Sequence, residues 1–499
     1  MAARVHTSKG IVLALACAAQ FMVVLDIAIV NVALPSIQRE LHVGPGTLQW
    51  IVIAYGLVLG GFLLFGGRMA DLAGRRRMLL TGLTLFSSAS LLAGVAESAG
   101  LLIGARALEG FGAALVAPAA LSTLAVTFAE GAERNRALGI YGAVTGISAS
   151  VGVIAGGLLT AGPGWRWVFF INVPLGVLLI AMSAIFLPLD ARGRRRSERF
   201  DIAGTVTVTA GLILLVYALD RGAESGWGSG PVLGLFAASV VMLAAFVRIE
   251  ARSRSPLVPG SSVRNRTLVA ANLSAFFAFG AIFSFIFLGS LLMQQVLGYS
   301  PTRTGVCWLA TTATSFIAAA VTGAKLVAVA GVRRLLVAGF SLLAVSALLL
   351  TRVPAGGHFA TDLLPALLLA GVAGGLCAPS AQIGALSGVT RSMTGLASGL
   401  VETMREIGGA IGVAAVSTIL VSRAGQIAGA RGPAARTLAA ANAFHAAYWV
   451  IFAVAALGAL TAAATFPRRT TQDTESVEPA PSHGSIVREP SQQAARDAA

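Results

Sequence analysis

The chain has 499 residues, of which 56% are hydrophobic and only 11% are charged, and its mean hydropathy is +0.82. This balance excludes the water-soluble globular classes and predicts a polytopic membrane protein. The formal net charge of +15 does not indicate a nucleic-acid partner, because the basic residues lie in short clusters between apolar runs, where they orient a membrane protein.

Fourteen apolar runs are long enough to be membrane spans, since a helix needs about 20 apolar residues to cross a bilayer. We expect an all-α fold with two six-helix bundles and two extra central helices. Residues 1–190 form the first bundle, 191–265 hold basic linkers and the extra helices, 266–466 form the second bundle, and 467–499 are a disordered cytoplasmic tail. The expected spans are Ile11 to Leu34, Leu48 to Gly66, Met78 to Ala96, Leu101 to Phe128, Ala137 to Thr160, Val168 to Leu187, Ala203 to Leu219, Val232 to Val247, Val269 to Met293, Val306 to Val329, Leu335 to Leu350, Leu363 to Leu386, Leu396 to Val421 and Phe444 to Phe466.

The loops predict the orientation of the chain. An even number of spans puts both termini on one side, and the loops on that side carry most of the Lys and Arg, including the run Arg75 to Arg77. Basic loops stay in the cytoplasm, so both termini are expected there. Three cysteines, Cys17, Cys307 and Cys377, have no CxxC spacing and indicate neither a disulfide framework nor a metal site.

The two halves share a weak internal repeat. A glycine and basic residues follow the second span of each half, as Gly74-Arg75-Arg76-Arg77 and as Gly331-Val332-Arg333-Arg334. Two related halves around a central pathway are typical of many secondary transporters.

Asp26 stands in the middle of the first span. A charged side chain at mid-membrane costs about 2.5–3.5 kcal/mol on insertion scales, so it is a functional-site hypothesis by default. Helix packing around a protonated acid is the alternative. Counted inward at about 1.5 Å per residue, Asp26 and Glu109 reach similar depths. Arg106 is one helical turn from Glu109 and can pair with either acid. We therefore predict that one acid balances Arg106 while the other exchanges a proton, with Asp26 as first choice and Glu109 as its competitor or as a structural partner of Arg106.

The second half carries another charged cluster, Glu402, Arg405 and Glu406, in the thirteenth span. Spacings of three and four place the three side chains on one helical face. Because lipid exposure would be prohibitive, that face should line the transport pathway. A substrate contact, a gate near the cytoplasmic end and a packed salt bridge all remain open.

The segments around these residues resemble the major facilitator superfamily, and specifically its fourteen-span drug:proton antiporter branch. The resemblance covers nearly the whole chain apart from the tail. The first motif, LDxTIVNVALP, contains Asp26 and Asn31 and departs from the family pattern at Ala28. It assigns Asn31 to the substrate pathway. The other matching segments are Gly67 to Arg76 with GxLADrxGRR, Leu102 to Ala114 with RxxQGxGAA, Trp165 to Gly176 with WRWxFxINxPxG, and the helix of Glu402 with GLxNTxRQxGGxxG.

Two further motifs acquire roles from this resemblance. The loop after the second span is expected to act as a conformational latch at the cytoplasmic face. The helix-five motif GxxxGPxxGG is only partly present, because Val153 replaces its proline, and this bears on the direction of transport. Ordinary glycine packing is its alternative role. The latch residues are Gly67, Asp71, Gly74, Arg75 and Arg76, and the helix-five glycines are Gly146, Gly152, Gly156 and Gly157.

Together these features predict a proton-coupled efflux antiporter that exports drugs or antibiotics across the bacterial cytoplasmic membrane by alternating access, and not an enzyme. Protons are the expected coupling ion, with no other cofactor and no metal, and the chain has no GxxxxGK[ST] loop for a nucleotide. The expected partners are membrane lipids and a small amphipathic substrate, with a cation favoured by the extra acids. The protein should be monomeric and bind no nucleic acid. A proton-coupled or facilitative transporter of a metabolite or lipid is the alternative, and a membrane sensor or receptor is the alternative from another class.

Overall fold

A computed structural model of the chain describes residues 8–188, 201–253, 256–354, 356–429 and 432–467. The described residues up to Phe466 belong to one compact unit. The tail that the sequence predicts to be disordered lies outside the described residues, apart from Pro467.

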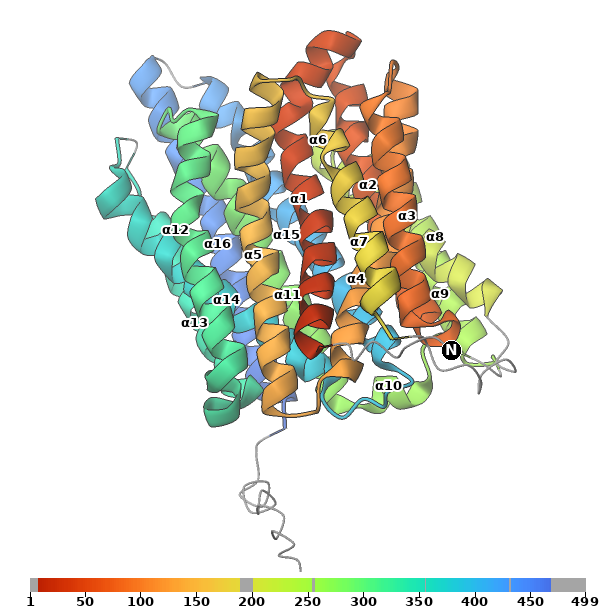
Figure 1. Ribbon diagram of the computed structural model, residues 1–499. Helices are drawn as coiled ribbons and strands as arrows, with labels where there is room; N and C mark the ends of the chain where they lie inside the picture. The colour runs from red at the N-terminus through yellow and green to blue at the C-terminus, as the bar shows by residue number, and fades with distance from the viewer. Residues whose placement is uncertain (1–7, 189–200, 254–255, 355, 430–431, 468–499) are drawn as a thin grey trace, which may run out of the picture. The chain divides into compact units, whose positions relative to one another are not determined.

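The described residues are almost entirely helical and include no strand, which confirms the expected all-α fold (Figure 1). The helices of the first half and the two extra helices are α1 (Lys9–Leu41), α2 (Pro45–Ala73), α3 (Arg75–Gly94), α4 (Ala99–Thr127), α5 (Ala132–Ala161), α6 (Trp167–Phe170), α7 (Asn172–Phe186), α8 (Ile202–Ser225) and α9 (Gly230–Glu250). The remaining elements are α10 (Gly260–Arg264), α11 (Arg266–Leu291), η1 (Leu292–Val296), α12 (Pro301–Val321), η2 (Thr322–Leu326), α13 (Val327–Leu350), η3 (Phe359–Leu363), α14 (Leu364–Leu386), α15 (Thr394–Gly429) and α16 (Pro433–Thr465).

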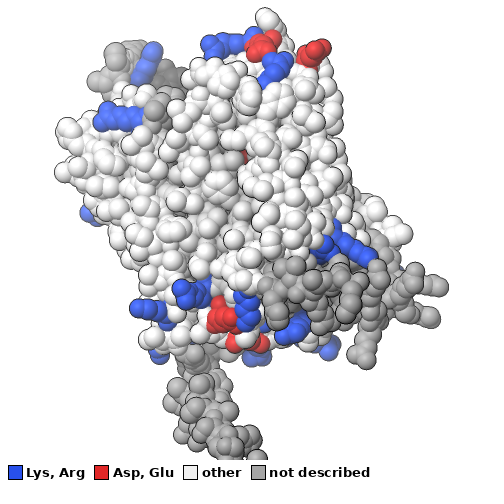
Figure 2. Space-filling model, viewed as in Figure 1, with Lys and Arg blue, Asp and Glu red and all other residues white. Residues whose placement is uncertain are grey.

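Thirteen helical stretches among the described residues are long and apolar enough to cross a membrane. One of them, Arg303–Leu350, has 48 residues and breaks at Gly331, whose φ of 76° and ψ of 157° are not helical. Glycine adopts a positive φ without steric cost, so the chain can turn there. The stretch therefore provides two crossings, in agreement with the expected fourteen. Figure 2 shows charged side chains gathered at the two ends of the molecule, with an uncharged band between them.

Helix α1 extends beyond the predicted span, which ended at Leu34. It continues through Pro35 to Leu41 and ends at His42, whose left-handed conformation lets its N–H bond back to the Gln38 carbonyl. Hydropathy marks only the part of a helix that lipid surrounds, whereas the end of a helix is set by its capping contacts. The polar last turn was therefore missed.

The same helix pairings occur in both halves. In the first half α1 packs on α5, and α4 packs on both α2 and α3; in the second half α11 packs on α15, and α14 packs on both α12 and α13. The two halves meet where α2 packs on α15 and where α5 packs on α12. Figure 1 shows α5 between α1 and α12. This matched order supports the weak sequence repeat.

The extra helices do more than flank the bundles. Helix α8 contacts both α2 and α15, so it covers the line where these two helices meet, and α9 packs on α8. The rings of Trp50 and Tyr217 lie 5.4 Å apart between α2 and α8. Trp227, just after α8, donates a hydrogen bond of 2.7 Å to Thr418 Oγ1 on α15. Helix α8 is therefore attached to both halves.

Two of the helix-five glycines bring α5 against α1. A Cβ atom on Gly152 would lie 2.7 Å from Ala28 Cβ and 2.8 Å from the Leu25 carbonyl oxygen, which leaves no room for it. Gly156 is nearly as tight, since its Cβ would lie 2.9 Å from the Ile29 oxygen. By contrast, Gly157 has nothing within 4 Å, and Gly146 would meet only Ser315 Oγ, at 3.5 Å. Gly152 and Gly156 thus allow α5 to pack directly against the part of α1 that contains Asp26, from Leu25 to Val32.

We expect Gly152→Ala to destabilise the protein by about 1–3 kcal/mol, because the added methyl group must separate α5 from α1. The matched variant Gly157→Ala, five residues further along the same helix, should be neutral or stabilising by up to about 1 kcal/mol, because alanine favours the helix. Thermal unfolding of the detergent-solubilised protein measures both. Equal melting temperatures would contradict the close contact between α1 and α5.

Candidate functional site

A buried ion cluster lies in the first half and is formed by Asp26 of α1 with Arg106 and Glu109 of α4; we call it the N-half cluster. Arg106 Nη1 lies 2.5 Å from Asp26 Oδ2 and 2.6 Å from Glu109 Oε2. Both acids are fully buried and the arginine is 2% exposed. The structure thus brings together the three residues that the sequence grouped by depth.

Helix α2 fixes the guanidinium group of Arg106. Its Nε donates a hydrogen bond of 3.2 Å to the Ile51 carbonyl, and its Cζ lies 4.3 Å from the centre of the Tyr55 ring. The hydroxyl of Tyr55 in turn donates to the Val23 carbonyl on α1. A guanidinium away from water needs partners for its donors and benefits from an aromatic face. Arg106 therefore ties α4 to both α1 and α2.

Asn172 is a member of this site that the sequence reasoning did not single out. Its Nδ2 donates to Asp26 Oδ1 at 2.9 Å and to Ser90 Oγ at 3.1 Å, and Ser90 donates to the Phe169 carbonyl. Asn172 lies in the WRWxFxINxPxG segment, and an amide side chain inside an apolar run could have marked it as a candidate site residue. Because of Asn172, both oxygens of Asp26 accept hydrogen bonds.

The N-half cluster has one cation for two acids. If both carboxylates are ionised, the cluster carries one uncompensated negative charge in a site without water contact, which is energetically costly. Asp26 uses both oxygens, whereas Glu109 Oε1 is buried and has no hydrogen-bond partner. The arrangement can therefore take up one proton, and Glu109 Oε1 is the acceptor left open for it.

A second ion cluster lies on α15 and consists of Glu402, Arg405 and Glu406; we call it the C-half cluster. Arg405 donates from Nε and Nη2 to Glu406 Oε1, at 3.2 and 2.9 Å, and its Nη1 lies 2.5 Å from Glu402 Oε2. Glu402 is 1% exposed and Arg405 is also buried, whereas the Glu406 side chain is 20% exposed. Asn31 joins neither cluster; it is exposed and donates to the Ile27 carbonyl of its own helix.

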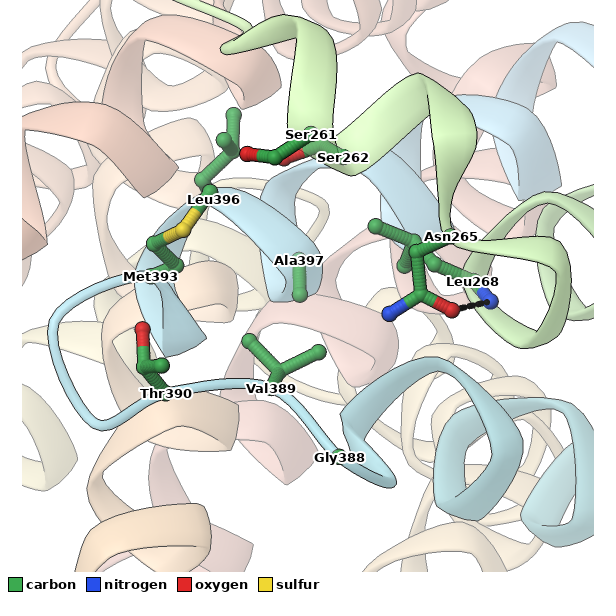
Figure 3. Close-up of a pocket in the computed structure, with 10 residues that line it drawn as sticks. All are labelled: Ser261, Ser262, Asn265, Leu268, Gly388, Val389, Thr390, Met393, Leu396 and Ala397. Atoms are coloured by element: carbon green, nitrogen blue, oxygen red, sulfur yellow. Dashed lines mark hydrogen bonds between the residues drawn. The ribbon is translucent and has the colours of Figure 1, made fainter.

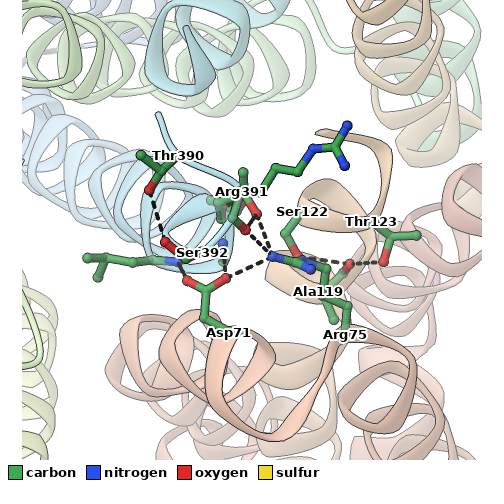
Figure 4. A network of polar contacts seen from close by, with 12 residues as sticks. Asp71, Arg75, Ala119, Ser122, Thr123, Thr390, Arg391 and Ser392 are labelled. Carbon is green, nitrogen blue, oxygen red and sulfur yellow. Dashed lines mark hydrogen bonds and ion pairs between the residues drawn. The ribbon is translucent and has the colours of Figure 1, made fainter. Parts of the chain in front are cut away.

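The latch residues join the two halves at the end of the molecule that carries Arg75, which we call the basic end. The Asp71 carboxylate accepts hydrogen bonds from the N–H groups of Gly395 and Leu396, both at 2.9 Å, and so caps the start of α15. Arg75 lies 3.3 Å from Asp71 and donates to the Arg391 carbonyl and, at 3.0 Å, to Thr394 Oγ1 (Figure 4). The first half thus supplies the cap for a helix of the second.

The other latch residues shape this contact or stay within the first half. A Cβ atom on Gly67 would lie 2.9 Å from the Gly399 Cα, so α2 and α15 touch through their backbones. Gly74 provides the turn between α2 and α3 with a φ of 103°. Arg76 donates to the Ala184 carbonyl of α7, in its own half.

A second tie at the basic end was not anticipated. Glu130 Oε1, just before α5, accepts a hydrogen bond of 3.1 Å from the Gly388 N–H, and Arg134 Nη1 donates to the Leu386 carbonyl at 3.4 Å. The second-half repeat, Gly331-Val332-Arg333-Arg334, has no acid that matches Asp71. The first half supplies the acid here as well, in the form of Glu130.

A cavity of about 170 Å³ lies beside the latch, between the start of α11 and the loop that precedes α15 (Figure 3). Ser262, Asn265, Val389 and Met393 line it, and none of the predicted site residues does. Within the described parts of the chain, no group of three His, Cys, Asp or Glu side chains is placed to hold a metal ion.

We expect Arg106→Gln to destabilise the protein by about 3–5 kcal/mol, because it leaves two buried carboxyl groups facing each other without their cation. The double variant Asp26→Asn with Arg106→Gln should recover part of this loss, since it removes one of the two acids. Chemical unfolding in detergent measures both. A single variant as stable as the parent would contradict the shared-cation arrangement.

We expect Asp71→Asn to open the basic end, because the start of α15 loses its charged cap. Spin labels at two exposed arginines, Arg136 on α5 and Arg334 on α13, report the distance between the halves, while the native cysteines are buried. The variant should show a new population at longer distance. Asp362→Asn, which alters a cap at η3, serves as control. Identical distributions in the parent and Asp71→Asn would refute the latch.

Comparison with known proteins gives the family. The family model described as Major Facilitator Superfamily matches residues 16–413 and 273–490. The puromycin resistance protein pur8 of Streptomyces alboniger is 38% identical over 81% of this chain and 80% of its own length. The cephamycin export protein CmcT of Amycolatopsis lactamdurans is 36% identical over 82% of this chain and 84% of its own length. The tetracenomycin C resistance and export protein of Streptomyces glaucescens is 34% identical over 81% of this chain and 75% of its own length.

Solved structures agree on the fold. The human organic anion transporter MFSD10 (TETRAN) superposes with a TM-score of 0.65 over 90% of this chain and 99% of its own, at 13% identity. The proton:xylose symporter XylE superposes with a TM-score of 0.63 over 91% of this chain and 94% of its own, at 14% identity. The chain therefore belongs to the major facilitator superfamily, within its drug-efflux branch, and is a multi-pass membrane transporter rather than an enzyme.

Proposed function

We propose that this protein is a proton-coupled efflux antiporter that exports drugs or antibiotics across the bacterial cytoplasmic membrane by alternating access. Three relatives that match it over most of their length are named for resistance to or export of antibiotics. The single observation that carries proton coupling is the N-half cluster, where two buried acids share the Nη1 atom of Arg106.

Within this cluster Glu109 is the proton carrier and Asp26 is the fixed counter-charge of Arg106. The sequence favoured Asp26 as the carrier. The contacts favour the opposite assignment, because both oxygens of Asp26 accept hydrogen bonds whereas Glu109 Oε1 accepts none. In the loaded state an O–H bond forms on Glu109 and the cluster is neutral. When the proton leaves to water, the cluster gains a negative charge, so release requires access to solvent.

Alternating access requires that the ends of the molecule open in turn. The Asp71 and Glu130 contacts hold the halves together at the basic end in this state. Because basic loops remain in the cytoplasm, this end and both termini are assigned to the cytoplasmic side. Exchange with the cytoplasm then requires that both ties break, and their re-formation returns the pump to the state seen here.

The substrate is a small amphipathic molecule, and the relatives' names make puromycin, cephamycins and tetracenomycin C the first compounds to try. A cationic substrate is favoured by the surplus acid in each cluster. Protons are the coupling ion, no other cofactor is needed, and a monomer in the lipid bilayer is the working unit. One net charge crossing 100 mV supplies about 2.3 kcal/mol, so one proton exchanged for a neutral substrate sustains a substrate gradient of more than tenfold at about 1.4 kcal/mol per tenfold.

Two rivals remain distinguishable by experiment. A proton-coupled or facilitative transporter of a metabolite or lipid would leave drug susceptibility unchanged when expressed in a pump-deficient host. A membrane sensor or receptor would move no compound at all in vesicles.

The decisive measurement is puromycin movement in proteoliposomes with and without an imposed pH gradient. We expect the gradient to drive transport in the parent, and Glu109→Gln to reduce this gradient-driven transport, because the open proton acceptor of the N-half cluster is lost. Glu97→Gln, at an exposed acid in the loop before α4, is the matched control and should behave like the parent. Transport of equal rate with and without the gradient would rule out proton coupling.

A further inference from the structure

The C-half cluster faces a set of buried polar side chains from the first half, and the two sets form what we call the junction. Gln20 of α1 and Tyr141 of α5 belong to the first half, and the Tyr141 hydroxyl donates to Gln20 Oε1 at 2.9 Å. Gln382 of α14 and Glu402 of α15 belong to the second. All four side chains are at most 5% exposed. Gln382 lies beside the Glu402 carboxyl group, and Tyr141 is close enough to interact with its charge.

Arg405 does not fully compensate Glu402. Two of its nitrogens, Nε and Nη2, donate to Glu406 Oε1, so the main partner of this arginine is Glu406. Its Nη1 also lies 2.5 Å from Glu402 Oε2, so this one arginine is shared between two acids. With both acids ionised, the C-half cluster would hold a net charge of minus one, as the N-half cluster does.

Other polar atoms of the junction are without partners. Gln382 Oε1 and Gln20 Nε2 are buried and make no hydrogen bond. A buried acceptor that lacks a donor and lies beside a carboxylate is unfavourable. A neutral carboxylic acid provides a donor and removes the surplus charge, so it fits this environment better than a carboxylate.

Among the described residues, Arg405 is the cation that acts on Glu402. Arg405 and Glu406 act on it from its own helix, and Tyr141 acts on it from α5. The neighbouring helix α14 carries no charged residue between Leu364 and Leu386, and α11 carries none between Thr267 and Leu291. On α2 the group near this cluster is Tyr55, which interacts with Glu406. On α4 the charged residues are Arg106 and Glu109, which are paired with each other in the N-half cluster.

We propose that Glu402 is a second proton-exchange site, so that the pump carries one exchangeable proton in each half and two per cycle. The proposal rests on the proposed function for its link to transport. An O–H bond forms on Glu402 when the junction is closed, as it is here. When the halves separate, water reaches the junction, the O–H bond breaks, the proton leaves to that water, and Arg405 balances the carboxylate left behind.

The positions of Glu109 and Glu402 along their helices are consistent with one proton site in each half. Glu109 lies about 15 Å from the start of α4 at the outer end, at about 1.5 Å per residue, whereas Glu402 lies about 12 Å from the start of α15 at the basic end. One proton site is therefore nearer the outer end and the other is nearer the basic end. Glu402 also touches the interface between halves, so its exposure changes whenever that interface opens.

Infrared spectroscopy tests the protonation directly and needs no substrate. A buried protonated carboxyl group gives a C=O stretching band that an ionised carboxylate lacks. We expect the unliganded parent in nanodiscs to show two such bands that disappear at high pH. Glu402→Gln should remove one, Glu109→Gln the other, and the exposed control Glu97→Gln neither. A Glu402→Gln spectrum identical to that of the parent would overturn the proposal, even if the protein proves to be a proton-coupled pump.

The transport consequence is a change in stoichiometry. In proteoliposomes, the pH gradient that just balances an opposing puromycin gradient gives the number of protons per substrate. We expect this number to fall from two in the parent to one in Glu402→Gln, and Glu402→Asp, which keeps the acid, should retain two. If Glu402→Gln retains the parent value, Glu402 carries no coupled proton. Loss of all transport in Glu402→Gln with full transport in Glu402→Asp, together with unchanged infrared bands, would instead assign Glu402 to substrate binding and contradict the proposal.

Discussion

The structure depends on one buried interaction, the guanidinium group of Arg106 shared between the carboxyl groups of Asp26 and Glu109. In an apolar environment such an ion cluster is stable only if its geometry is close and its remaining polar atoms are paired. Ile51, Tyr55 and Asn172 supply much of that pairing from α2 and α7, whereas Glu109 Oε1 has no hydrogen-bond partner. The cluster therefore links four helices of the first half. Because it has two acids for one arginine, it can also take up a proton.

The two clusters follow one plan with different partners. In each, an arginine and a glutamate lie three residues apart on one helix and a second acid completes the set, across helices as Asp26 or on the same helix as Glu406. Asn172 donates a hydrogen bond to the second oxygen of Asp26, while the amide group beside Glu402 is that of Gln382. The difference is one of surroundings, because the first cluster lies inside a bundle and the second lies where two bundles meet.

Close helix contacts make the interface between the halves responsive to small changes. Gly67 and Gly399 bring α2 and α15 together through their backbones, and Asp71 caps α15 from the opposite half. Such contacts are lost completely when the helices move apart by a few ångströms, since both hydrogen bonds and van der Waals attraction are short-ranged. Helix α8, attached to α2 and to α15, must accommodate that movement.

The sequence alone determined the membrane class, the crossings and the candidate acids, because hydropathy and the cost of a charge in lipid act residue by residue. It placed Asp26, Arg106 and Glu109 together through the regular rise of two helices. It did not find Asn172 or the tie through Glu130. Only the tertiary structure decided these points, because hydrogen-bond satisfaction depends on side chains that are 82 or more residues apart in the chain. The junction of Gln20, Tyr141, Gln382 and Glu402 arises in the same way, since its members come from four helices in two halves.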